Sequence, residues 1–136
     1  MHTINVLRIA ISLLTLSALL SPALADNGIH QAATEMCPGN AFSDTCQLTH
    51  TFAHGDHAIV LVSNVEFRQT SFALISKKDN LWGIVRSGRA SDLETMAAYP
   101  NDPYAFDGNE IIKESGPSDT LTNLLEQAHT YFESRY

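Results

Sequence analysis

Apolar residues gather most densely between Ala58 and Arg86, where they are separated by short polar breaks. Ala58–Val62 is an unbroken apolar run rich in β-branched residues, which is typical of a strand with both faces covered. Ser71–Lys77 and a further segment that begins at Leu81 repeat the pattern of a strand. This part of the chain therefore predicts an antiparallel β-meander with Ala58–Val62 as its central strand.

Three details of the meander can be predicted from residue type. The dipeptide Asp79-Asn80 favours a tight turn, because Asp bonds to its own backbone and Asn tolerates a left-handed conformation. Val65 and Phe67 alternate with charged residues, so we expect the chain to continue there as a half-exposed strand. Gly83 is expected to leave room for a neighbouring backbone or a large ring to approach.

Helical patterns precede the meander. Apolar residues recur there at helical spacing and predict a short amphipathic helix from residue 27 or 28 to 37; they are Ile29, Ala32, Ala33 and Met36. Ser43 and Asp44 can cap a second helical turn that carries Cys46 and reaches His50. The tripeptide His54-Gly55-Asp56 then predicts the turn into the central strand.

Two further helices are expected after the meander. Ser91 and Glu94 have the spacing of a capping box before a short helix. Ser118 can cap the last helix, whose apolar face should lie on the sheet; this face consists of Leu121, Leu124, Leu125, Ala128 and Phe132. We therefore predict an α+β fold, in which a meander of three or four strands packs against short N-terminal helices and a C-terminal amphipathic helix.

The first 25 residues have the organisation of a secretory signal peptide. Arg8 is followed by the apolar core Ile9–Leu20 and by Ser21–Ala25, which ends in an Ala-x-Ala cleavage pattern. The apolar core is too short for a spanning helix, which needs about 20 residues. We expect a protein of the periplasm or the secreted space with no stable membrane anchor after cleavage, and a single small domain over residues 26–136.

Charge limits the class of partner. The chain carries 8 Lys and Arg against 15 Asp and Glu, a formal net charge of −7. Binding to nucleic acid depends on clustered cations that neutralise phosphates, so we expect no nucleic-acid partner. The basic residues are concentrated between Asn64 and Ala90, which predicts a locally basic sheet on an acidic molecule.

Cys37 and Cys46 are the two cysteines of the chain, and both follow the predicted signal peptide. Exported proteins meet oxidising conditions, so a disulfide between them is the expected state. No Cys-x-x-Cys spacing is present, and the even count argues against a free catalytic thiol.

The hairpin has a familiar pattern. His57–Val62 followed by Ser71–Val85 resembles small exported bacterial domains of unassigned role and, in its hairpin, the sheets of cystatin-like and NTF2-like folds. In those folds a strand that ends in basic residues turns into one that bears a Trp, as Lys77 and Trp82 do here. The resemblance implies an α+β architecture and transfers no catalytic residue.

The most suggestive polar cluster is formed by His50, His54 and His57. On a helix, His50 and His54 would share a face at the spacing that lets two imidazoles reach one metal ion. Asp56 or His57 could then supply a third ligand or orient one of the imidazoles. We predict no resident cofactor; if these residues do bind a metal, zinc or copper is the expected ion.

A second candidate is the aromatic loop that begins at Tyr99, where Tyr99, Tyr104 and Phe106 accompany two prolines. Rings held on a stiff backbone suit a surface that binds a partner, although their packing on the core is the alternative. The same loop contains Asp102, Asp107, Asn109 and Glu110, oxygen ligands that calcium could use without the spacing of an EF-hand.

These observations lead to one preferred function and two alternatives. The preferred hypothesis is a non-enzymatic exported protein that binds another protein as an inhibitor, an immunity protein or an accessory subunit. The first alternative is a periplasmic metal-binding protein that uses the histidine cluster. The second is a small enzyme, which would need a pocket with converging polar side chains between the sheet and the helices.

Overall fold

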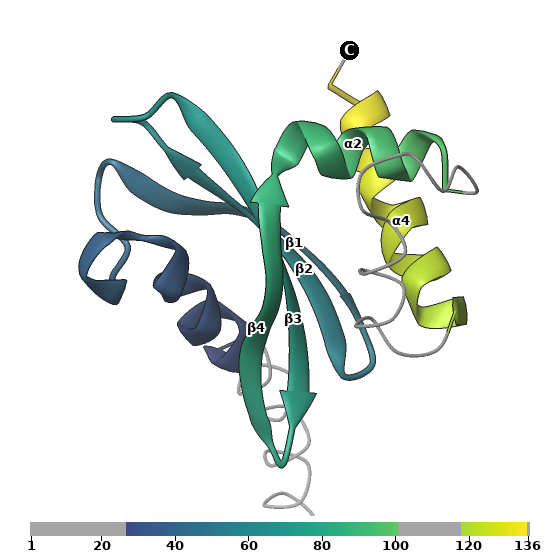
Figure 1. The fold of residues 1–136 in the computed structure, drawn as a ribbon, viewed down its shortest axis with the longest axis horizontal. Helices are drawn as coiled ribbons and strands as arrows, with labels where there is room; N and C mark the ends of the chain where they lie inside the picture. Colours follow the sequence, from purple (N-terminus) through teal and green to yellow (C-terminus); the bar gives the residue numbers. More distant parts are fainter. Residues whose placement is uncertain (1–26, 101–117, 136) are drawn as a thin grey trace, which may run out of the picture.

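The computed structural model describes residues 27–100 and 118–135. Four antiparallel strands form one sheet in the order β1-β2-β3-β4, so each strand pairs with its neighbour in the sequence. Their bounds are Cys46–His54 for β1, His57–Asn64 for β2, Gln69–Lys78 for β3 and Leu81–Arg89 for β4. Figure 1 shows this sheet between an N-terminal helical segment on one side and the helices α2 and α4 on the other. The predicted α+β fold is confirmed, with four strands.

The β2 strand lies inside the sheet, as predicted for Ala58–Val62. Ile59 and Leu61 point to the face covered by α2 and α4, whereas Ala58, Val60 and Val62 point to the opposite face. All five side chains are buried. Full burial of a Val, Leu or Ile side chain contributes about 1.5–3 kcal/mol, so both faces of this one strand stabilise the fold.

The tight turns on either side of this core follow the sequence. Asp79 and Asn80 have φ angles of 52° and 64°, the left-handed pair that a two-residue hairpin turn requires. Gly55 has a φ of 59° in the turn from β1 to β2, where His54 pairs with His57. Both predicted turns are confirmed.

The helical turn predicted after Ser43 is wrong, because these residues lead into strand β1. A β-bulge explains why the strand was hard to recognise: Leu48 pairs with Val62 and His50 pairs with Leu61, which leaves Thr49 as an extra residue. An extra residue reverses the alternation of side chains along a strand. Thus Leu48 packs with the N-terminal segment, whereas Phe52 packs with α2 and α4.

The predicted extension of the central strand through Val65 and Phe67 is also wrong. The β2 strand ends at Asn64, and residues 65–68 form a turn before β3 begins at Gln69. The spacing of two between Val65 and Phe67 matched a strand, but these residues have no pairing partner in the sheet.

The close approach expected at Gly83 occurs at Gly28 instead. A Cβ atom at Gly83 would meet nothing within 4 Å, whereas one at Gly28 would overlap the indole ring of Trp82. Trp82 and Ile84 pack against the N-terminal segment, so the absence of a side chain at Gly28 lets a helix lie directly on the ring.

The N-terminal segment covers one face of the sheet. Residues 27–33 form a helix, and 3₁₀ turns follow at Thr34–Met36 and Pro38–Asn40. The predicted apolar side of this segment is confirmed, because Ile29, Ala32 and Ala33 are buried against the sheet. The predicted disulfide between Cys37 and Cys46 is confirmed and joins the segment to the first residue of β1.

The other face is covered by α2 (Ala90–Ala98) and α4 (Ser118–Glu133). The α2 helix buries its predicted apolar side, but the capping box at Ser91 is wrong. The helix begins at Ala90, and its N-cap is Arg89, which makes no side-chain hydrogen bond. The predicted apolar face of α4 is confirmed, with Leu124 and Ala128 fully buried on the sheet. The predicted cap by the Ser118 side chain lies outside the described residues.

Among the described residues, no helix has both the length and the apolar character needed to cross a membrane. The predicted signal peptide lies outside these residues, and the single domain over residues 26–136 stays a prediction.

Candidate binding site

The end of the sheet at which β2 passes into β3 carries two features of functional interest. One is the β2–β3 turn, formed by Val65, Glu66, Phe67 and Arg68. The other is a pocket between this end of the sheet and the C-terminal end of α4, which we name the Arg135 pocket.

Hydrogen bonds hold the backbone of the β2–β3 turn in one conformation. The Val65 N–H donates to the Thr45 carbonyl at 2.8 Å, and the Arg68 N–H donates to the Val65 carbonyl at 3.2 Å. The Glu66 N–H donates to the Asn64 side-chain oxygen at 3.1 Å, an Asx turn that the sequence Asn-x-Glu permits. The turn is thus anchored to the residue that precedes β1 as well as to its own strands.

Two apolar side chains of this turn face solvent. Val65 is 63% exposed and Phe67 is 70% exposed, so neither takes part in the core. Phe67 also borders a recess of about 300 Å³ on the face covered by the N-terminal segment, next to Met36 and Pro38. This end of the sheet therefore presents an exposed aromatic side chain next to a shallow recess.

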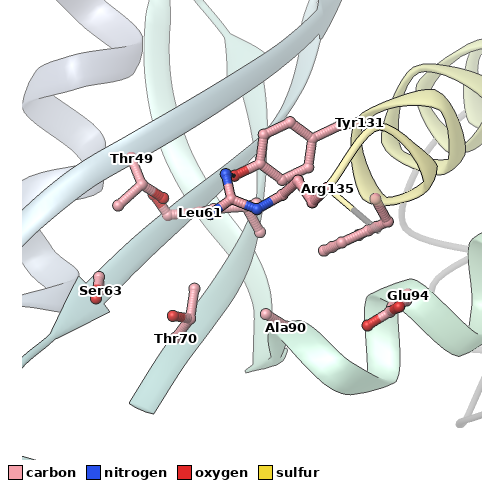
Figure 2. A pocket seen from close by; sticks show the side chains of 9 residues that line it. Thr49, Leu61, Ser63, Thr70, Ala90, Glu94, Tyr131 and Arg135 are labelled. Carbon is pink, nitrogen blue, oxygen red and sulfur yellow. Dashed lines mark hydrogen bonds between the residues drawn. The ribbon is translucent and has the colours of Figure 1, made fainter. Parts of the chain in front are cut away.

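The Arg135 pocket opens on the opposite face of the sheet and has a volume of about 610 Å³. Figure 2 shows its floor on the strands and its walls on the two helices. The strands contribute Thr49, Leu61, Ser63 and Thr70, and α2 contributes Ala90 and Glu94. Tyr131 and Phe132 come from the C-terminal end of α4, and Arg135 comes from the turn that follows it. This volume lies within the range of roughly 300–1,000 Å³ that is common for small-molecule sites.

One of the polar side chains of the pocket lies at the bulge in β1. Thr49 is the unpaired residue of the bulge, and its hydroxyl donates to the Leu61 carbonyl at 3.2 Å. Leu48 faces the N-terminal segment, so regular alternation already directs the Thr49 side chain to the pocket face. The bulge then directs His50 to that same face, where its ring packs on Tyr131.

Tyr131 forms one wall of the pocket, and its ring contacts other aromatic side chains. Its ring stacks on His50 at a centroid distance of 4.4 Å and contacts Phe52 edge-on at 5.6 Å. Phe132 meets Tyr131 edge-on at 5.3 Å. Contacts on several sides restrict the ring and fix the direction of its hydroxyl group.

Arg135 reaches back over this ring. Its Nη1 atom donates to the Tyr131 hydroxyl oxygen at 2.8 Å, and Cζ lies 5.2 Å from the ring centroid. Tyr131 lies in the last turn of α4, and Arg135 follows the helix in a turn where its N–H donates to the Phe132 carbonyl at 3.2 Å. The guanidinium group is thereby held at the pocket while it remains accessible to solvent.

The predicted metal ligands are not arranged as the helical spacing assumed. His50 and His54 lie in strand β1, where four residues span about 13 Å. His54 and His57 are paired across the hairpin, whereas the His50 ring packs on Tyr131 and Phe52. Within the described residues, no three His, Cys, Asp or Glu side chains form a group that could hold a metal ion.

The predicted partner-binding residues are described only in part. Tyr99 follows α2 and is 64% exposed, and its role in binding stays a prediction. Tyr104 and Phe106 lie outside the described residues, as do the oxygen ligands of the candidate calcium loop.

Sequence reasoning did not find Val65, Phe67, Thr49 or Arg135 as site residues. The spacing of Tyr131 and Arg135 on a predicted helix was the available signal for the last of these. Comparison of the chain with protein-family models, with curated proteins and with solved structures finds no match in any of the three.

Proposed function

We propose that the protein is a small, exported, non-enzymatic protein that binds another protein through the β2–β3 turn. The observation that carries the proposal is the exposure of Val65 and Phe67 on a turn whose backbone is already held by hydrogen bonds. The disulfide between Cys37 and Cys46 supports export, because such bonds persist in oxidising compartments.

Burial of the exposed side chains would contribute favourable free energy to binding. Burial of the exposed apolar surface of Val65 and Phe67 against a partner would contribute roughly 1–2 kcal/mol each. The turn loses little conformational freedom on binding, since its backbone is ordered beforehand. Neither side chain belongs to the buried core, so a contact outside the chain is the use that their exposure supports.

The charged residues of the turn suit a polar rim around this contact. Glu66 and Arg68 alternate with Val65 and Phe67, and both are exposed. Interfaces commonly surround an apolar centre with solvent-accessible polar groups, which favour one orientation of the partner. The fitting partner is a protein with an apolar recess for Phe67 and opposite charges beside it.

The test compares two variants that remove similar apolar surface at opposite ends of the sheet. Phe67→Thr removes the proposed anchor, and Leu81→Thr removes a side chain that is 74% exposed at the β3–β4 turn. The mature protein and both variants would be used as baits in an extract of the compartment to which it is exported. We expect proteins that wild type and Leu81→Thr both recover to be lost with Phe67→Thr.

Thermal unfolding is the control for structure, and both variants should unfold within a few degrees of wild type, since surface substitutions usually change stability by less than about 0.5 kcal/mol. Equal recovery of partners by Phe67→Thr and wild type would refute the role of the turn.

A further inference from the structure

The floor of the Arg135 pocket brings together hydroxyl groups from three strands. Ser63 and Thr70 are directly paired between β2 and β3, and Thr49 comes from the bulge of β1. All three residues line the pocket. The Ser63 and Thr70 hydroxyl groups can each donate and accept a hydrogen bond, whereas the Thr49 hydroxyl already donates to the Leu61 carbonyl and is left to accept one. Such a floor suits a ligand that itself carries hydroxyl groups.

Arg135 supplies a fixed positive charge at the same pocket. One of its N–H groups is used by the Tyr131 hydroxyl oxygen, and a guanidinium group has five N–H donors in all. The remaining donors can bind a carboxylate in the paired geometry that Arg favours. Contact with the Tyr131 ring restrains the side chain, which lowers the entropy that it loses when it binds an anion.

The remaining walls limit the ligand further. Leu61, Ala90 and Phe132 provide apolar surface, and Glu94 brings a carboxylate from α2. A carboxylate accepts hydrogen bonds from ligand hydroxyl groups and disfavours a second negative charge on the ligand.

We propose that the Arg135 pocket binds a small hydroxylated carboxylate of the sugar-acid class. The carboxylate of the ligand pairs with Arg135, and its hydroxyl groups bond to Thr49, Ser63 and Thr70. A neutral sugar lacks the group that Arg135 binds, and a simple fatty acid leaves the polar floor of the pocket without partners. This site is separate from the β2–β3 turn, so it adds a small-molecule activity to the proposed binding of a protein.

Three probes separate the contribution of the carboxylate from that of the hydroxyl groups. D-glucuronate carries both kinds of group, D-glucose lacks the carboxylate, and hexanoate lacks the hydroxyl groups. Titration of the full mature protein, followed by amide chemical shifts, measures affinity and locates the site in one experiment. We expect saturable binding of glucuronate, with shifts centred on the pocket. Glucose should bind about tenfold or more weakly because it loses a charge-assisted hydrogen bond. Hexanoate should also bind about tenfold or more weakly because it loses several neutral hydrogen bonds, each of which accounts for a factor of about five.

Variants test the assignment of each group. Arg135→Gln should weaken glucuronate binding by about tenfold or more, and Thr49→Val, which keeps the shape of the side chain, by roughly threefold. Lys78→Gln makes the same change in net charge at the far end of β3 and should bind as wild type does. Phe67→Thr should also bind glucuronate as wild type does, which makes this test independent of the proposed protein contact.

Several results would overturn the proposal. They are the absence of saturable glucuronate binding to the wild-type protein, shifts centred elsewhere, and equal losses for Arg135→Gln and Lys78→Gln. Equal affinity for glucuronate and hexanoate would also count against it, because the hydroxyl floor would then have no role.

Discussion

Removal of the disulfide should weaken the attachment of the N-terminal segment to the sheet. Cys37 and Cys46 are nine residues apart and both are buried, so the bond closes a short loop at the edge of the core. In the chain-entropy model a loop of about ten residues contributes about 2.7 kcal/mol at 25 °C. Since 1 kcal/mol corresponds to roughly 4 °C for a domain of this size, Tm should fall by about 10 °C.

The assay is thermal unfolding of the wild-type protein and the double variant Cys37→Ala/Cys46→Ala, each with and without dithiothreitol. Reductant should lower the Tm of the wild-type protein towards that of the variant and leave the variant unchanged. Alkylation and mass measurement confirm that the thiols are free. If the fully reduced wild-type protein keeps its Tm, packing of residues such as Ile29 and Ala33 holds the segment, and the reasoning is refuted.

Two further predictions concern backbone positions. Gly28→Ala should destabilise the protein by about 1–3 kcal/mol in urea unfolding because the new Cβ atom overlaps the Trp82 ring, whereas Gly83→Ala, which meets nothing, should change stability by less than about 1 kcal/mol. Equal losses for the two variants would contradict the placement of the helix on Trp82. Asn80→Gly should be neutral or stabilising and Asn80→Ala should cost about 1 kcal/mol, because φ is 64° at this position; a loss caused by the glycine variant would argue against the left-handed turn.

The parts of the fold that could be predicted are those in which one pattern dominates. Ala58–Val62 is too short for a helix and apolar on both faces, so an internal strand was the interpretation that its pattern favoured. The last helix presents Leu121, Leu124, Leu125 and Ala128 at regular spacing, and a single face of it is buried. At Asp79 and Asn80, residue type alone indicated the left-handed turn.

Strand β1 could not be recognised because its pattern is broken by the structure itself. Cys46 and Leu48 face one side of the sheet, Phe52 faces the other, and the bulge at Thr49 reverses the alternation between them. Neither alternation extends over the whole segment, so a search for apolar residues at every second position does not detect the strand. The same irregularity explains the error in the predicted helical spacing of the histidines.

The candidate site depends on contacts between distant parts of the chain. Thr49, Ser63 and Thr70 lie on three strands and Arg135 in the turn after α4, and only the packing of α4 on the sheet makes them line one pocket. Phe67 had the spacing of a strand residue, and its exposure follows from the end of β2 at Asn64. Local patterns contain no information on either arrangement.

The most direct test of the proposed function is site-specific photo-crosslinking in the cells that produce the protein. A photoreactive phenylalanine analogue would replace Phe67 in one variant and Leu81, equally exposed at the other end of the sheet, in a matched one. If the β2–β3 turn is the recognition surface, position 67 should give a discrete crosslinked protein and position 81 should give none. No crosslink at position 67, or the same products from both positions, would contradict the proposal.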